Sequence, residues 1–153
     1  MPPSAPPTSY DGLRPPVLRV ETRRRARALQ LLYAWETRGR PTLSALIPDF
    51  ARLIRVRPGP LEDIEAMALR VIDELPRLDA LIAAATAHWR MERIGRLERM
   101  ILRLGTAELL RPSVPARTAI DESLWLTHRF VGEGAIGFVN GVLDRVARDL
   151  GRL

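Results

Sequence analysis

The 153-residue sequence contains no cysteine, no lysine and only two histidines. Without cysteine, disulfide bonds and thiolate metal sites are excluded. The histidines, His88 and His128, do not stand in a spaced metal-ligand motif, so we expect no metal site. Adjacent carboxylates such as Asp121 and Glu122 point about 100° apart on a helix and do not form an acid–base pair. We therefore expect no catalytic residue, no cofactor and no enzymatic activity.

Long apolar runs are also missing. The longest, residues 80–87, is far too short to cross a bilayer. Residues 1–20 contain six prolines and lack the apolar core of a secretory signal, so we expect a disordered, Pro-rich basic tail. The remaining length suits one domain over residues 21–153. The sequence thus predicts a cytoplasmic protein without a membrane segment.

From residue 21 to the end, apolar residues recur at helical spacing, and no useful stretch alternates with the period of a strand. Proline and glycine breaks, such as Pro58-Gly59-Pro60, divide this pattern into seven segments. The sequence predicts an all-α bundle. The expected helices cover residues 22–37, 43–53, 61–75, 76–85, 94–104, 115–131 and 136–150.

Positive charge is concentrated at the start of the first expected helix. Six arginines and one glutamate lie between Arg14 and Arg27, which places +5 of the net charge of +6 in this segment. Arginine at a helix N-terminus opposes the helix dipole, and a polyanion would offset that cost. We interpret the cluster as a site for nucleic-acid phosphates; the alternative is an ordinary charged helix end.

The stretch from Gly132 to Gly137 matches the dinucleotide-binding pattern G-x-G-x-x-G. That fingerprint requires a preceding strand and an acidic residue about 20 positions later, and neither is expected here. We interpret the stretch as a turn between helices. Gly137 and Gly141, four residues apart, favour a close crossing of two helices.

Two further helical faces carry candidate contacts. Arg96, Arg99 and Arg103 recur at helical spacing, which predicts a solvated face with ion pairs or a protein-binding face. Phe138 flanks the apolar stripe of the last helix. It either stacks on an unpaired base or packs beneath the preceding turn, and the local pattern leaves both open.

Three sequence stretches together resemble the NusB family of transcription antitermination factors. They are RRRARALQLLYAW at 23–35, LERMILRLGTAEL at 97–109, and AIDES at 119–123 followed by FVNGVLD at 138–144. Their order and spacing extend the resemblance over about residues 23–148. It implies a compact bundle of about seven helices in two small subdomains.

The resemblance also implies a function. Proteins of this family bind the boxA element of nascent ribosomal RNA together with a small-subunit ribosomal protein, called NusE in this role. The pair joins the RNA polymerase antitermination complex. The residues implied for RNA binding are Arg23, Arg24, Arg25, Arg27, Phe138 and Asn140, and those for the protein partner are Tyr33, Glu98 and Arg99.

The chain departs from the family pattern at Gly137, where a basic residue usually precedes the FVNG string, so weaker RNA binding is expected. The register of the arginine cluster can also shift by two, so the cluster is a firmer prediction than any one arginine. The alternatives are a helical RNA-docking domain related to the N-terminal domain of an RNA cytosine methyltransferase, and a protein-interaction module without RNA binding. An exposed apolar helix face could also form a homodimer.

Overall fold

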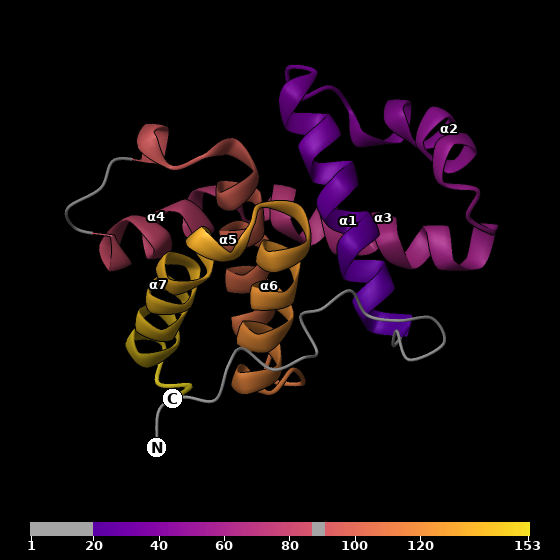
Figure 1. Cartoon of the computed structure of the whole chain (residues 1–153). Helices are drawn as coiled ribbons and strands as arrows, with labels where there is room; N and C mark the ends of the chain where they lie inside the picture. The colour runs from indigo at the N-terminus through magenta and orange to yellow at the C-terminus, as the bar shows by residue number, and fades with distance from the viewer. Residues whose placement is uncertain (1–19, 87–90) are drawn as a thin grey trace.

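The computed structural model describes residues 20–86 and 91–153, which form seven α-helices and no strand (Figure 1). The predicted all-α fold is confirmed. The helices are α1 Val20–Thr37, α2 Leu43–Ile54, α3 Pro58–Asp73, α4 Leu75–Ala85, α5 Arg96–Leu109, α6 Ala116–Phe130 and α7 Ile136–Asp149. Short 3₁₀ turns at Met91–Arg93 and Glu133–Ala135 precede α5 and α7. No helix in these ranges is long and apolar enough to span a membrane.

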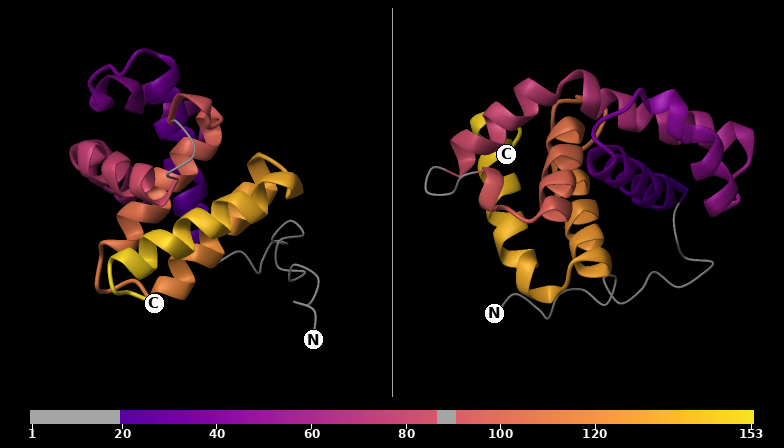
Figure 2. Two further views of the ribbon diagram at one scale, coloured as in Figure 1. Left: turned by 90° about the vertical axis from the view of Figure 1, so that its left-hand side faces the viewer. Right: turned by 90° about the horizontal axis from the view of Figure 1, so that it is seen from above.

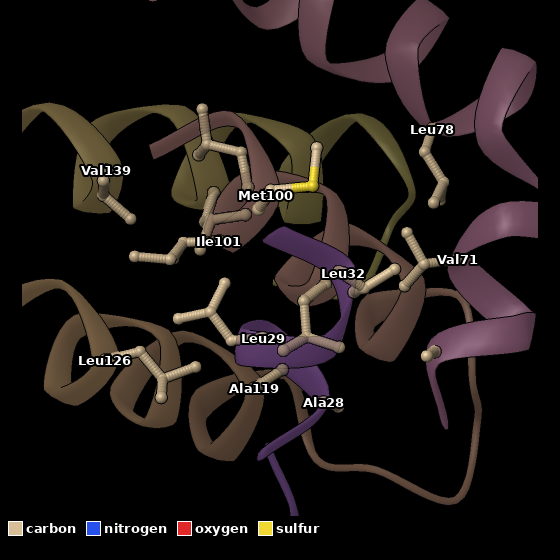
Figure 3. Packing of buried hydrophobic residues seen from close by; sticks show 14 of the residues in the cluster. Ala28, Leu29, Leu32, Val71, Leu78, Met100, Ile101, Ala119, Leu126 and Val139 are labelled. Atoms are coloured by element: carbon tan, nitrogen blue, oxygen red, sulfur yellow. The ribbon is translucent and has the colours of Figure 1, made fainter. Parts of the chain in front are cut away.

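Helix α5 is the centre of the fold. It packs against α1 and α3 on one side and against α4, α6 and α7 on the other, so two groups of helices share it (Figure 2). Every residue from 100 to 106 is buried, which is unusual because a surface helix buries only one stripe. The close-up in Figure 3 shows Met100 and Ile101 of α5 between side chains of other helices. Both groups of helices thus contribute to one continuous core.

The closest packing in this core occurs at Gly105 of α5. A Cβ atom at this position would lie 2.5 Å from Ser123 Oγ of α6 and 3.0 Å from Leu143 Cδ1 of α7. Only glycine fits there without a shift. The prediction that Gly137 and Gly141 allow a close crossing is wrong, because a Cβ atom at either would meet open space.

The helix boundaries refine the sequence predictions. Helix α1 begins at Val20, so the last residue of the predicted tail is helical, and the rest of that tail lies outside the described residues, as does His88. Helix α3 begins at Pro58, because a proline in the first turn loses no helical hydrogen bond. The predicted break at Pro58-Gly59-Pro60 is therefore wrong in position, because these residues belong to α3 and the chain leaves the helix at residues 55–57.

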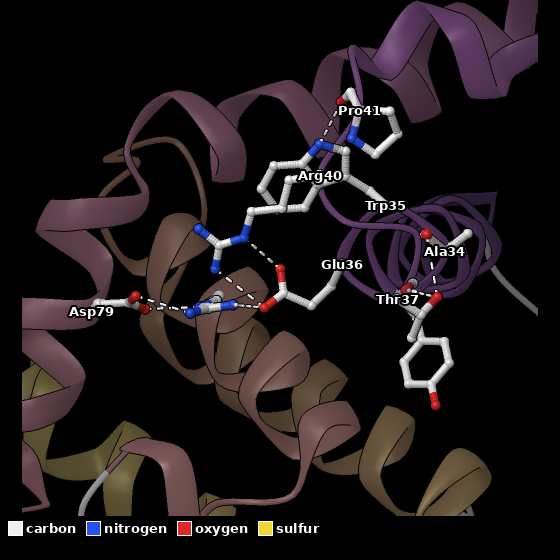
Figure 4. Close-up of polar contacts among 9 residues, drawn as sticks. Ala34, Trp35, Glu36, Thr37, Arg40, Pro41 and Asp79 are labelled. Atoms are coloured by element: carbon white, nitrogen blue, oxygen red, sulfur yellow. Dashed lines mark hydrogen bonds and ion pairs between the residues drawn. The ribbon is translucent and has the colours of Figure 1, made fainter.

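Arg103 corrects the prediction of a solvated arginine face on α5. Its side chain is only 3% exposed, and its guanidinium donates to both carboxylate oxygens of Asp79, at 2.7 and 2.9 Å. Glu36 lies 3.7 Å away and also accepts two hydrogen bonds from Arg40, which sits over the ring of Trp35 (Figure 4). Arg103 therefore links α5 to α4 through Asp79 and to α1 through Glu36.

Candidate nucleic-acid and partner interface

The arginine cluster of α1 divides between two faces of the helix. Arg25 is buried and lies three and four residues before Ala28 and Leu29, which belong to the core. Arg23 is exposed and Arg27 is partly exposed, four residues apart on another face. The helical period of 3.6 residues therefore assigns neighbouring arginines to different environments.

Arg25 is held by carboxylates of α5 and α6. Its guanidinium donates to both oxygens of Glu108, at 2.8 and 2.9 Å, and lies 3.5 Å from Glu122, which also accepts from Thr22. Burial acts against the charge, but the hydrogen bond and charge of Glu108 and the charge of Glu122 outweigh it and raise the pKa of Arg25. Because two carboxylates hold this guanidinium inside the protein, we do not propose that Arg25 binds phosphate.

Arg24 occupies an intermediate position. Its guanidinium forms a 3.0 Å ion pair with Asp63 of α3, and both side chains are partly open to solvent. Exposed pairs of this kind contribute about 0–1 kcal/mol to stability. A phosphate can therefore compete with Asp63 for this side chain at low cost.

Arg23 and Arg27 open into a groove between α1 and α6, which we call the α1–α6 groove. Its other lining residues are Ala26, Gln30, Trp125, Arg129 and Phe130. Within the described residues, Arg23 and Arg129 form no ion pair; Arg27 donates to Gln30 at 3.0 Å, and Arg129 lies over Phe130. The groove thus presents three cations without a neutralising carboxylate.

Trp125 and Phe130 supply the aromatic part of the α1–α6 groove lining. Trp125 is 7% exposed, and its indole Nε1 is buried away from solvent with no acceptor among the described residues. Phe130 is partly exposed. The groove therefore combines three cations with an aromatic surface.

An apolar patch adjoins this groove. It is lined by Leu29, Gln30, Tyr33, Leu97 and Phe130, and we call it the Tyr33 patch. Tyr33 is 39% exposed, which makes it one of the large hydrophobic side chains that the described surface leaves open. An exposed tyrosine in an apolar setting is typical of a protein-binding surface.

Glu98 and Arg99 follow Leu97 in the first turn of α5 and are both partly buried. The Nε atom of Arg99 is buried and has no hydrogen-bond partner among the described residues. The structure therefore brings all three predicted partner residues to the region where α1 meets α5.

Phe138 and Asn140 lie on α7 and do not line either of these surfaces. Phe138 is partly buried and packs against the core, whereas Asn140 is exposed. Neither of the two surfaces therefore includes the predicted aromatic residue. Sequence reasoning missed Arg129 and Trp125, because they lie about a hundred residues from the cluster and only the fold brings α6 close to α1.

Comparison with known proteins identifies the fold. Residues 22–148 match the model of the NusB family. The chain belongs to the NusB family. It is 39% identical over 133 residues to the transcription antitermination protein NusB of Sorangium cellulosum (strain So ce56), which covers 84% of this chain and 92% of that relative. The family resemblance seen in the sequence is therefore confirmed.

Solved NusB structures agree with this assignment. NusB of T. maritima superposes with a TM-score of 0.75 at 28% identity, covering 84% of this chain and 90% of that one. A crystal structure of the antitermination factors NusB and NusE in complex with double-stranded RNA gives a TM-score of 0.76 at 26% identity, covering 86% of this chain and 98% of that one.

Among residues 20–86 and 91–153, no cluster of histidine and acidic side chains could hold a metal ion.

Proposed function

We propose that this chain is an RNA-binding antitermination factor of the cytoplasm. It binds boxA of nascent ribosomal RNA with the ribosomal protein that acts as NusE, and the pair joins the RNA polymerase antitermination complex. Family membership and the solved complex of NusB, NusE and RNA support this role. The binding is electrostatic and stacking in nature and needs no cofactor.

The observation that carries the proposal is the cationic α1–α6 groove. Arg23, Arg27 and Arg129 line one groove and have no carboxylate partner within the described chain, whereas the buried Arg25 and Arg103 are held by Glu108 and Asp79. Guanidinium groups bind phosphate through two parallel hydrogen bonds and also stack on bases. Three such groups beside Phe130 suit a single RNA strand, with phosphates on the arginines and a base on the ring.

The Tyr33 patch is the site that we assign to the ribosomal protein. Tyr33 and Leu97 provide apolar contact area, and Glu98 and Arg99, which follow Leu97 in the chain, provide charged groups. Aromatic residues dominate binding energy when they are buried at the centre of an interface. Phe138 and Asn140 of α7 remain proposed RNA contacts beyond the α1–α6 groove.

The test is a gel shift or anisotropy titration of boxA RNA and a scrambled RNA, with and without the ribosomal partner. The double variant R23Q/R27Q removes two phosphate-binding cations. We expect weaker boxA binding and a salt slope smaller by about 1.4, because each contact to a single strand contributes about 0.7.

The matched control is R70Q/R117Q, which removes the same charge from exposed positions outside the groove. If R23Q/R27Q kept the slope of the wild type, or if boxA and scrambled RNA bound equally with the partner present, the proposal would be wrong. A transcription assay with a terminator downstream of boxA then measures antitermination directly, and Y33A should reduce readthrough by weakening the partner contact.

A further inference from the structure

A second basic groove lies on the other side of α1, between its first turns and the loop that joins α2 to α3. We call it the α1–α3 groove. Its rim carries five arginines: Arg23, Arg24, Arg27, Arg55 and Arg57. Its floor is apolar and includes Ile54, Val56 and Ile64. With a volume of about 410 Å³, it is larger than the α1–α6 groove, at about 310 Å³.

The charge of this groove is poorly compensated. Among the five arginines of the rim, only Arg24 forms an ion pair with a described residue, Asp63 at 3.0 Å. Arg55 and Arg57 make no hydrogen bond, ion pair or ring contact through their side chains within the described chain, and both are exposed. Clustered cations repel each other unless an anion lies between them, so the geometry favours an anionic occupant.

The backbone at Arg55 supports a role for its side chain. Arg40 and Arg55 are the two described non-glycine residues with positive φ, at 59° and 52°. Such a left-handed position after a helix is usually glycine, because other residues are strained there. Arg40 has an internal explanation, since it binds Glu36 and lies over Trp35. Arg55 has no such contact, so a charged side chain is held at a strained position for no visible structural benefit.

The two basic grooves adjoin each other along α1. Arg23 and Arg27 line both of them, one helical turn apart on α1. A strand lying in the α1–α6 groove therefore meets the α1–α3 groove as soon as it crosses α1. Arginines on the rim and aliphatic side chains on the floor suit phosphates and the faces of sugars or bases, respectively.

We propose that the α1–α3 groove binds the backbone of RNA that flanks the element held in the α1–α6 groove, with Arg55 and Arg57 as the contacts specific to the flank. This inference rests on the proposed function. Because this groove shares Arg23 and Arg27 with the proposed RNA-binding groove, an RNA strand is favoured over an acidic peptide. Because the contacts are to phosphates, the flank is bound without regard to its sequence.

The experiment compares a short RNA that contains only boxA with the same RNA extended by about ten unstructured nucleotides at each end, in the presence of the ribosomal partner. The wild type should bind the extended RNA more tightly and with a steeper salt dependence. R55Q/R57Q should bind it about tenfold more weakly than the wild type does, with a slope smaller by about 1.4, and should bind the short RNA unchanged. R70Q/R117Q is again the matched control.

The outcomes separate this inference from the proposed function. If the extension tightened RNA binding by R55Q/R57Q as much as by the wild type, the flank assignment would be overturned while boxA binding stood. The same would follow if R55Q/R57Q bound both RNAs more weakly by the same factor. If an acidic peptide displaced the extension from the wild type but not the short RNA, the groove would be a protein site. If R23Q/R27Q left both RNAs unaffected, the proposed function itself would fail.

A second variant tests the strained position independently of folding defects. R55G restores the residue that a left-handed backbone prefers, so the melting temperature should not fall, yet binding of the extended RNA should weaken. Loss of RNA affinity in a protein at least as stable as the wild type would support the inference. Unchanged affinity would contradict it.

Discussion

The inward and outward arginines of this protein illustrate how one residue type serves two purposes. Arg25 and Arg103 are less than 10% exposed, and each makes a bidentate contact with a carboxylate from another helix. Arg23 and Arg129 are exposed and have no carboxylate partner in the described chain. The side chains are identical, so helical phase and the neighbouring helices alone decide whether an arginine joins the core or faces a ligand.

The difference also explains why arginine content is a poor guide to function here. The chain has 24 basic residues and no lysine. Arg152 is another that serves the fold, because its guanidinium donates to the carbonyl oxygens of Leu109 and Val114 and so fastens the end of the chain to the α5–α6 turn. Arginines that are buried and held by partners inside the protein are not available to a polyanion.

The largest expected effect on stability comes from substituting an inward arginine. R25M leaves the buried Glu108 and the partly buried Glu122 without a counter-charge, so the free energy of unfolding should fall by about 3–5 kcal/mol. R25M/E108Q should recover part of this loss, because less uncompensated charge is buried. Urea denaturation measures both. Equal stability of R25M and the wild type would remove the distinction between the two classes.

Two glycines test whether the difference between inward and outward positions also holds for a residue other than arginine. G105A should cost about 1–3 kcal/mol, because its Cβ atom would force Ser123 or Leu143 to move. G141A, which meets open space on a helix, should instead stabilise the protein by about 0.5–1 kcal/mol. Thermal melts of the two variants test this pair, and effects of the same sign would contradict the packing assigned to α5.

A pH titration tests the cluster of Glu36, Arg40 and Arg103. The hydrogen bond from Arg40 and the charges of Arg40 and Arg103 lower the pKa of Glu36 below 4.5, against the effect of burial. A lowered folded-state pKa stabilises the protein above the unfolded-state pKa, and this stability is lost as pH falls through the folded value. E36Q should cost about 1–2 kcal/mol at neutral pH. The two proteins should converge as pH falls through the folded-state pKa of Glu36; a constant difference down to pH 2 would refute this assignment.

The smallest effect is expected for the outward class. R23Q/R27Q should change the free energy of unfolding by less than about 0.5 kcal/mol, and a slight gain would follow from removing cations near a helix N-terminus. Measured beside the RNA titrations, this variant separates binding from folding. A loss comparable to that of R25M would mean that Arg23 and Arg27 support the fold.

Much of this architecture could be predicted from sequence. Apolar periodicity and proline breaks located all seven helices, with bounds correct to within three residues except at the end of α5, which is Leu109 and not residue 104. The phase of Arg25, in line with Ala28, Leu29 and Leu32, could also have revealed its burial, because a core stripe extends backwards at the same spacing. Arg129 and Arg55 could not be anticipated, since their proximity to α1 depends on how α6 and the α2–α3 loop pack.

Gln30 and Phe130 line both the α1–α6 groove and the Tyr33 patch. Two macromolecules seated on these surfaces would therefore touch the same two side chains and adjoin each other across them. Ordering these residues for the first arrival lowers the entropic cost for the second, which is a source of positive heterotropic coupling. Such coupling is reciprocal, so the factor by which the protein partner tightens RNA binding must equal the factor by which RNA tightens the protein complex.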